Sequence, residues 1–470
     1  MIDHEKTSPS VPERSMMTTV SAPASTKSDV RVVEKIGYFA ANFGNIILST
    51  VISSFLLIYL TDHVGINAAA VGTLLLVARL VDGATDPIMG YLVDHLPRTS
   101  WGRFRSYLLI GGAVGAVAFV ALFLAPGFVG ASLVAAWITY LIWGLAFDLM
   151  DIPLNALLPS MSASPRSRGQ LAAIKGTTYL IGTLVVIGVS LPVVALLGGG
   201  ALGWQVYVVI IAVVSFALTA TGALLVRERV APSTAEPYRF SDAKALFLSS
   251  RAVPVLLVSK LATSAANAAL MAGIPFFFTY YAGSAGLVSA VALVMVVPMM
   301  LGSISGPLLG QRIGFKPVYL SSLVIAGLGI GSILLLPGLE GPAYLVCFGV
   351  AGLGFGGAVA LNYAMLAELT DFVELKGGFR TEGTLASIGS FAAKAGAGIG
   401  GALIAYVLAF SGYVAGAEQT PEALAGIALA QGGVPAALVV IGGLVFLAYP
   451  ITRTVAAETR AALNERNIVR

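Results

Sequence analysis

Charged side chains are scarce in this sequence. Asp, Glu, Lys and Arg make up 11% of its 470 residues, whereas 57% are hydrophobic. A water-soluble domain carries about 25% charged residues, so this shortage indicates a membrane protein. The net charge of +4 would suggest nucleic acid as the partner of a soluble chain. Here the basic residues flank apolar runs, so we expect a lipid bilayer and no nucleic acid.

Cysteine and histidine are also nearly absent. The single cysteine, Cys347, excludes an intramolecular disulfide, and no CxxC motif or His/Cys cluster predicts a structural metal. The three histidines, His4, His63 and His95, lie outside the apolar runs, so no intramembrane histidine relay is expected. No GxGxxG follows a strand and no GxxxxGKS/T occurs, so neither a cofactor nor ATP-driven transport is predicted. The sequence shows no nucleophile–base pair that would suggest catalysis, so an enzyme is not predicted.

Long apolar runs, in contrast, fill most of the chain. Twelve of them reach about 20 residues or more, enough to cross ~30 Å of hydrocarbon as helices. They cover residues 36–61, 68–94, 107–127, 132–158, 170–196, 204–226, 252–282, 285–309, 317–337, 342–371, 384–410 and 427–451. The sequence therefore predicts an all-α membrane protein with twelve transmembrane helices.

Lysine and arginine occupy only every second connection between these runs. The other six connections contain neither residue: 62–67, 128–131, 197–203, 283–284, 338–341 and 411–426. Because Lys- and Arg-rich loops stay on the cytoplasmic side, the asymmetry predicts that both termini are cytoplasmic, in the cell inner membrane.

The chain divides into two similar parts flanked by tails. Residues 1–35 are rich in Ser, Thr and Pro and lack the apolar core of a signal peptide, which predicts a disordered cytoplasmic tail. The basic segment 227–251 is the longest cytoplasmic connection and separates residues 36–226 from residues 252–451, with six runs in each half. A second cytoplasmic tail is expected at 452–470.

Each half has a basic turn after its second run. Arg103 and Arg105 lie in the first turn, and Arg312 and Lys316 in the second. Matching turns in a six-plus-six arrangement suggest the two related halves of the major facilitator fold. A substrate site is then expected between the halves, near the membrane midplane.

Two aspartates lie inside the second run. Asp82 and Asp86 are four residues apart and share one helical face. Carboxylates at this depth are costly and are normally retained for function. With the Thr85 hydroxyl they can replace the hydration shell of a small cation, or mutual repulsion and burial can make one of them bind a proton. The alternative is a structural ion pair with Arg79, Lys260 or Lys394.

A second acidic pair lies in the fourth run. Asp148 and Asp151 are three residues apart, and Pro153 follows where a bend would frame them. A third carboxylate near the first pair would raise the local proton affinity, so H+ coupling is considered alongside Na+. Lys394, in the eleventh run, could snorkel to the membrane surface; in a central position it would counter the acids across the interface between the halves and sense whether a cation is bound.

Several ordered motifs carry a family resemblance. They are "GYFAANFGN", "FLLIYLTDHVGI", "LLLVARLVDGATDPIMGYLVD", "WGRFRSY", "FDLMDIPLNALLPSMS", "AELTDFVELKGGFRTEG" and "SFAAKAGAGIGG". Over about residues 36–455 the chain resembles the glycoside–pentoside–hexuronide:cation symporters, the melibiose-permease branch of the major facilitator superfamily. The resemblance implies a cation-coupled symporter.

The resemblance also implies roles for single residues. Asp82 and Asp86 match the positions that bind the coupling cation in the family. Asp148 stands where the melibiose permease has a threonine that helps to hold the cation. Asp151 matches an acid of the sugar site, and Lys394 matches a lysine close to the cation site.

The departures from the family pattern fall in the sugar site. Ile46 replaces the acid of the first helix, with Asn45 before it where a lysine would be, and Asn155 replaces a stacking tryptophan. Gly176 replaces a sugar-contacting arginine, although Lys175 is adjacent. The polar groups expected to line a replacement pocket are Asn42, Asn45, Asp151, Asn155, Lys175, Asn267, Tyr363 and Lys394.

Charged residues near the cytoplasmic helix ends are predicted to form an inner gate. Such groups can lock one state and release during rocking of the halves, although plain topology signalling explains the same residues. The predicted gate residues are Arg79, Asp94, Arg103, Arg105, Arg312, Lys316 and Arg380.

The leading hypothesis is a monomeric secondary transporter. It would import a sugar or glycoside with Na+ or H+ by alternating access. A second hypothesis keeps the fold but carries a less polar amphiphile or drug-like solute, inward or outward. A third is a non-transporting sensor, against which the retention of costly buried acids argues.

Overall fold

The computed structural model describes residues 30–95, 99, 101–130, 132–162, 164–229, 250–377 and 382–468. The first half contains α1 (Val32–Ile58), η1 (Tyr59–His63), α2 (Ala68–His95), α3 (Phe104–Phe128), α4 (Leu133–Met161), α5 (Pro165–Leu196) and α6 (Gly200–Leu225). The second half contains α8 (Ala252–Phe276), η2 (Phe277–Tyr281), α9 (Leu287–Ile313), α10 (Phe315–Leu335), α11 (Gly341–Gly377), α12 (Glu382–Phe410), α13 (Pro421–Ala428), η3 (Leu429–Gly433), α14 (Val434–Leu447) and α15 (Arg453–Ile468).

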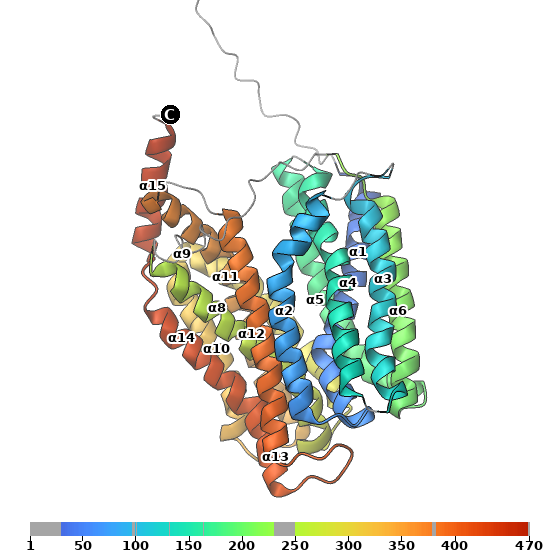
Figure 1. The fold of residues 1–470 in the computed structure, drawn as a ribbon. Coiled ribbons are helices and arrows are strands. Elements are labelled where there is room, and N and C mark those ends of the chain that lie inside the picture. Colours follow the sequence, from blue (N-terminus) through green and yellow to red (C-terminus); the bar gives the residue numbers. More distant parts are fainter. Residues whose placement is uncertain are drawn as a thin grey trace, which may run out of the picture.

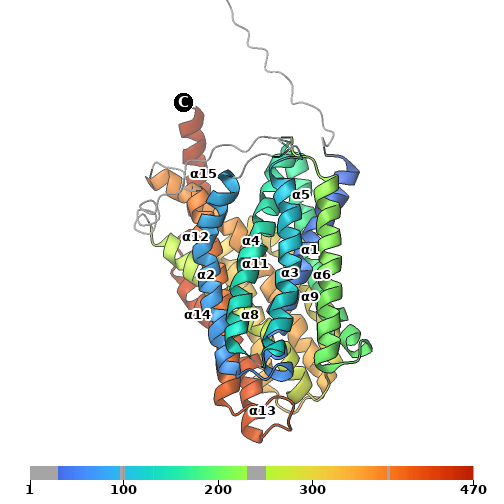
Figure 2. The same cartoon turned by 45° about the vertical axis from the view of Figure 1, so that its right-hand side comes forward.

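Among the described residues, twelve helices are long and apolar enough to cross a membrane, which confirms the predicted number of spans. The two halves lie side by side, with α1–α6 on one side and α8–α14 on the other (Figure 1). They meet where α2 packs along α12, α1 contacts α8 and α5 contacts α9. α2 and α12 stay adjacent in the second view (Figure 2).

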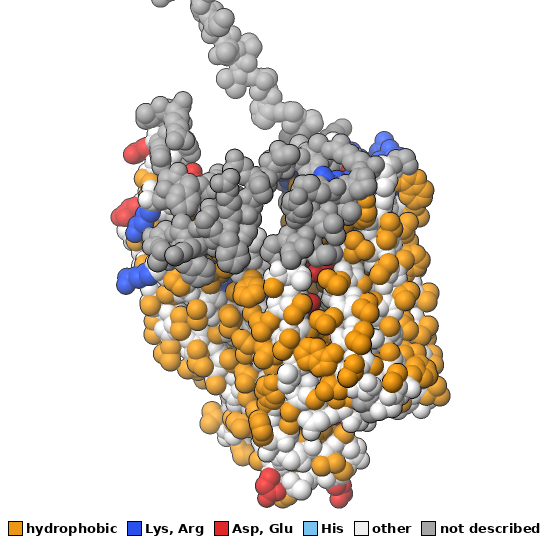
Figure 3. Space-filling view, in the orientation of Figure 1, with side chains coloured by type: hydrophobic (Ala, Val, Ile, Leu, Met, Phe, Trp, Pro, Cys, Tyr) orange, Lys and Arg blue, Asp and Glu red, His pale blue; other side chains and the backbone are white. Residues whose placement is uncertain are grey.

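The bundle has two distinct ends. We call the end from which α15 projects the terminal end, and the end formed by η1, η2 and α13 the distal end (Figure 1). Between them the surface is a belt of hydrophobic side chains with few charges, and some acidic atoms are visible near the seam between the halves (Figure 3). Large apolar side chains such as Val117 and Val213, 71% and 62% exposed, lie in spans that would face lipid.

Glycines let the helices of one half approach closely. A methyl group at Gly396 of α12 would overlap the Leu261 carbonyl of α8, and one at Gly400 would overlap the Ala265 carbonyl. Lipid supplies no hydrophobic drive between helices, so such close backbone contact is a main source of association energy. The many glycines of the eleventh run therefore have a packing role.

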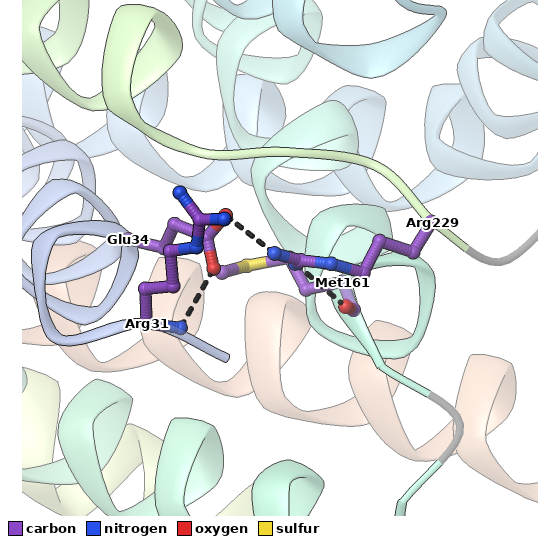
Figure 4. A network of polar contacts seen from close by, with 4 residues as sticks. All are labelled: Arg31, Glu34, Met161 and Arg229. Atoms are coloured by element: carbon purple, nitrogen blue, oxygen red, sulfur yellow. Dashed lines mark hydrogen bonds and ion pairs between the residues drawn. The ribbon is translucent and has the colours of Figure 1, made fainter. Parts of the chain in front are cut away.

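The first helix begins earlier than predicted. Residues 32–35 were assigned to the tail, but α1 starts at Val32. Glu34 fixes this end: it is 2% exposed, accepts a hydrogen bond from the Arg31 amide at 2.8 Å and pairs with Arg229 Nη2 at 2.6 Å. Arg229 also donates to the Met161 carbonyl, so the ends of α1, α4 and α6 are tied together (Figure 4).

The segment after the last span is helical, although the sequence predicted only a tail there. α15 covers Arg453–Ile468 and contacts α11, with Ala456 and Thr459 buried. The Arg460 guanidinium reaches Glu368 of α11 at 2.6 Å. The helix contains several charged residues and no long apolar run, so the sequence pattern did not predict a span there.

Candidate transport site

The acids of the second and fourth spans face each other. Asp82 of α2 is 8% exposed, and its Oδ2 lies 3.7 Å from Nη1 of Arg79. A methyl group at Gly144 of α4 would collide with Asp82 Oδ1, so this glycine lets the carboxylate approach α4. Asp148, one turn further along α4 and 4% exposed, therefore lies next to it.

A lysine from the other half completes this cluster. Nζ of Lys394 on α12 lies 3.7 Å from Oδ1 of Asp148. The predicted association of Asp82, Asp148 and Lys394 is thus present in the structure, across the seam between the halves. Asp86 belongs to α2, but its side chain lies outside the described residues, as do the side chains of Asp94 and Arg380.

Both acid–base distances exceed the length of a hydrogen bond. Buried charges separated in this way retain part of their desolvation cost, so a small cation or a proton can compete for the carboxylates. The Thr85 hydroxyl donates to the Asp82 backbone carbonyl at 3.1 Å, which leaves the lone pairs of its oxygen available to a cation. Within the described part of the chain no group of three or more His, Cys, Asp or Glu side chains is placed to hold a metal ion.

A second polar cluster extends from α4 to α5. Asn155 donates to Asp151 Oδ2 at 2.8 Å and accepts a hydrogen bond from Lys175 Nζ. Asn45 and Lys394 also lie close enough to act electrostatically on Asp151. Asp151 thus connects the two clusters, and five of the residues predicted for the pocket come together here.

A cavity of ≈ 200 Å³ lies between the halves. Hydroxyl and amide groups supply its polar lining, and methionine, leucine, valine and alanine side chains supply the larger, apolar part. The residues that line it are Thr50, Ser53, Ser54, Tyr179, Leu180, Thr183, Ser264, Asn267, Ala268, Met271, Val296, Met299, Ala393 and Ala397. Among the predicted substrate residues, only Asn267 lines this cavity.

The hydroxyls of α1 were missed by the sequence reading. Thr50, Ser53 and Ser54 recur at spacings of three and four residues, which places them on one face of a helix. Such a polar stripe in an otherwise apolar span was the available signal. Asn42 was predicted instead, but it is 3% exposed and donates to the Tyr38 carbonyl of its own helix at 2.7 Å. Its amide group is therefore hydrogen-bonded within α1, and Asn42 is not among the residues that line the cavity.

Two predicted gate residues have a different role in this structure. Arg105, at the start of α3, donates to the carbonyls of Ala223 and Leu224 at the end of α6, at 2.8 and 3.0 Å. Lys316, at the start of α10, donates to the carbonyls of Leu447, the last residue of α14, and of Tyr449 just after it, at 2.8 and 2.7 Å. Each thus caps a helix within its own half, which explains the repeated basic turn.

The other described gate residues lie in different surroundings. Arg79 lies with Asp82 in the acid cluster, deep in α2. The Arg103 guanidinium lies 5.6 Å from the ring centroid of the adjacent Phe104, and Arg312 is exposed. The side chains of Asp94 and Arg380, the other predicted gate residues, lie outside the described residues, so the inner gate stays a prediction.

The distal end carries a cross-half contact that the sequence reading did not find. Asp62 of η1 accepts hydrogen bonds from the hydroxyl of Tyr280 on η2 and from Tyr413, which is 2.7 Å from both carboxylate oxygens. We call Asp62, Tyr280 and Tyr413 the distal latch. Burial, and then the Asp62 carboxylate, raise the pKa of the Tyr413 phenol, so it remains a donor at neutral pH.

Comparison with known proteins identifies the family of this chain. The family model described as MFS/sugar transport protein matches residues 37–453. The chain belongs to this family. Its fold is also that of solved transporters: the nucleoside transporter NupG superposes with a TM-score of 0.63 at 17% identity, covering 88% of this chain and 98% of NupG. A bacterial homologue of the human lysosomal transporter Spinster gives a TM-score of 0.66 at 14% identity, covering 91% and 96%.

Relatives within the family cover almost the whole chain. The isoprimeverose transporter of Lactiplantibacillus pentosus is 31% identical over 444 residues, which are 92% of this chain and 91% of that protein. The glucuronide carrier protein homolog of Escherichia coli is 28% identical, with 89% and 92% covered. The putative glycoside/cation symporter YagG of Escherichia coli is 27% identical, with 78% and 80% covered. The family resemblance expected from the sequence is thus confirmed.

Proposed function

We propose that this chain is a cation-coupled symporter that carries a sugar or glycoside by alternating access. The contact between Asp148 of α4 and Lys394 of α12 carries this proposal, because it joins the two halves beside the hydroxyl-lined cavity. Hydroxyl and amide groups match the hydrogen-bonding needs of a sugar. The relatives named as sugar transporters and symporters support the same function.

The coupling ion is proposed to be Na+ or H+. Either one, bound by Asp82 and Asp148, would neutralise the carboxylates and weaken the hold of Arg79 and Lys394. Lys394 also acts electrostatically on Asp151 in the second cluster. A cation bound at one cluster therefore changes the charge felt by a solute at the other, and the coupling is reciprocal by thermodynamic linkage.

The protein is proposed to work as a monomer in the inner membrane, with the terminal end in the cytoplasm. The basic loops support this orientation, because Arg105 and Lys316 lie at that end. The distal end would then face outward. Since the latch holds the halves together there, the conformation described would correspond to the inward-facing half of the cycle.

Uptake by the reconstituted protein tests the proposal. Proteoliposomes are loaded under imposed Na+ or H+ gradients and offered a panel of neutral and anionic glycosides. Accumulation should depend on one of the gradients, and Asp82→Asn should abolish uphill accumulation while leaving the protein folded. Glu418→Gln, an exposed change near the distal end, is the matched control and should transport normally. Accumulation that neither gradient drives would refute symport.

A further inference from the structure

Each acid described at the two clusters has a basic neighbour. Asp82 lies beside Arg79, Asp148 beside Lys394, and Asp151 is linked through Asn155 to Lys175. One further lysine, Lys260 of α8, lies in the same part of the membrane. A charge at this depth is costly unless something compensates it, so its partner matters.

Lys260 has no ion-pair partner among the described side chains. Its Nζ lies 5.4 Å from the ring centroid of Tyr363 on α11. The lysine itself is half-buried. A tyrosine face compensates an ammonium only in part, because the ring quadrupole is a weaker partner than a carboxylate. The pair therefore retains the capacity to bind an anion.

The lysine points toward the path of the solute. Lys260, Ser264 and Asn267 recur at spacings of four and three residues on α8, and the last two line the cavity. On α12, Gly389, Ala393 and Ala397 form a similar stripe, whose last two members also line the cavity.

Gly389 shows where the ammonium lies. A methyl group there would come within 3.2 Å of Lys260 Nζ. The ammonium therefore lies about one helical turn, roughly 5.4 Å, from the cavity on its terminal side.

Aromatic residues of both halves surround this position. Tyr363 is 69% exposed, so most of its surface is open to a solute. Tyr179 of α5 lines the cavity and lies near enough to Tyr363 to act on it electrostatically. Lys175 is one turn from Tyr179 on the same face of α5. The space between the halves is therefore bordered by two lysines and two tyrosines.

We infer that the transported solute carries an anionic group, a carboxylate or a sulfonate, which binds the Lys260 ammonium while the sugar hydroxyls occupy the cavity. This inference rests on the proposed function and narrows its substrate class to acidic sugars and acidic glycosides. The anion supplies the charge that Lys260 lacks, and Tyr363 holds the ammonium in place until it arrives. Lys175, already engaged by Asn155, adds positive potential from the opposite half.

Matched probes test the inference on the reconstituted full chain. Uptake of methyl β-D-glucuronide is compared with that of methyl β-D-glucoside, which has the same ring without the carboxylate. A methyl glycoside of 6-sulfoquinovose tests the sulfonate. A charge-assisted hydrogen bond contributes about 1.5–3 kcal/mol, so an anionic probe should be preferred at least tenfold in kcat/KM. Whichever of the two anionic probes is preferred identifies the natural anion.

Variants assign the preference to Lys260. Lys260→Met keeps the length of the side chain without its charge and should reduce the anionic-to-neutral ratio about tenfold. Lys260→Arg should restore most of the ratio. The control is Lys35→Met, because Lys35 is also a partly buried lysine but bonds Gln170 at the terminal end. It should leave the ratio unchanged.

The contrary outcomes separate the two proposals. Gradient-driven uptake of the neutral glucoside at a rate equal to the anionic probes would overturn the anion site and leave symport standing. An equal fall of both rates in Lys260→Met would do the same, since it would show a purely structural lysine. No driven uptake of any glycoside by folded protein would overturn the proposed function and the inference with it.

Discussion

Asp148 and Lys394 are expected to behave as a unit. Asp148 is 4% exposed, and its partner comes from the other half of the protein. Removing one member deprives the other, buried charge of this partner, at a cost of up to about 3–5 kcal/mol, whereas removing both leaves neither charge. Asp148→Asn and Lys394→Met should each lower the unfolding midpoint of the purified protein, and the double variant should lower it by less than the sum.

An exposed ion pair provides the control for this double-mutant cycle. Arg460 and Glu368 lie 2.6 Å apart, but the Arg460 side chain is 58% exposed. Exposed pairs contribute about 0–1 kcal/mol, so Arg460→Met and Glu368→Gln should be nearly additive. If the Asp148–Lys394 cycle shows no larger coupling than this pair, the two residues do not stabilise each other.

At the residue scale, the sequence identified the charged residues of the site more readily than its hydroxyl-bearing residues. Asp82, Asp148 and Lys394 stand out because a charge inside an apolar run requires an explanation. Ser53 does not stand out in the sequence, because a serine hydroxyl can donate to a carbonyl of its own helix. In the structure it donates to the Thr50 carbonyl at 3.2 Å. A hydroxyl satisfied in this way costs little anywhere in a span, so its direction becomes visible only with the neighbouring helices in place.

One glutamate after α6 holds the start of α3. Glu228 accepts hydrogen bonds from the backbone amides of Arg103, Phe104 and Arg105 at 3.0, 2.8 and 2.9 Å. Gly102, with φ +117°, makes room for its carboxylate. Since a negative charge also complements the positive end of the helix dipole, Glu228→Gln should lower the stability by about 1–2 kcal/mol.

Chemical unfolding of the variant measures this loss. Glu418→Gln removes the same charge from an exposed position in the loop after α12 and should leave the unfolding curve unchanged. A loss in Glu228→Gln no greater than in Glu418→Gln would show that the cap contributes nothing to the stability of α3.

At the element scale, the sequence predicted the spans but not all of their ends. Hydrophobic length specifies a helix across the membrane, and all twelve helices are found. The ends depend on contacts with residues far along the chain, such as the Glu34–Arg229 pair that accompanies the early start of α1. α15 was missed for a different reason: it packs on α11 at the terminal end and is too polar to be recognised as a span.

At the scale of the whole molecule, the six-plus-six division followed from the repeated basic turns. The turns proved to be helix caps, in which Arg105 and Lys316 hold the last helix of each half. Local capping therefore accounts for the repeat without a gate, and the gate role of these residues stays a prediction. The distal latch was missed because Asp62, Tyr280 and Tyr413 are far apart in the chain and meet only when the halves close.

The latch is expected to set the balance between the two open states. Tyr413→Phe removes the hydrogen bonds to both oxygens of Asp62, and one charge-assisted bond contributes about 1.5–3 kcal/mol. The population open at the distal end should therefore rise about tenfold or more. In a Cys347→Ala background, a cysteine placed at Ser53 in the cavity reports this opening through its labelling by an impermeant maleimide added at the distal side.

Tyr59→Phe is the matched control for the latch, because it also removes one tyrosine hydroxyl near the distal end. That hydroxyl donates to the Phe123 carbonyl at 2.8 Å, within the first half, so its loss should not favour separation of the halves. Labelling at Ser53→Cys should accelerate in Tyr413→Phe and stay at the background rate in Tyr59→Phe. Equal rates in both would mean that the packing of α2 against α12, and not the latch, keeps the distal end closed.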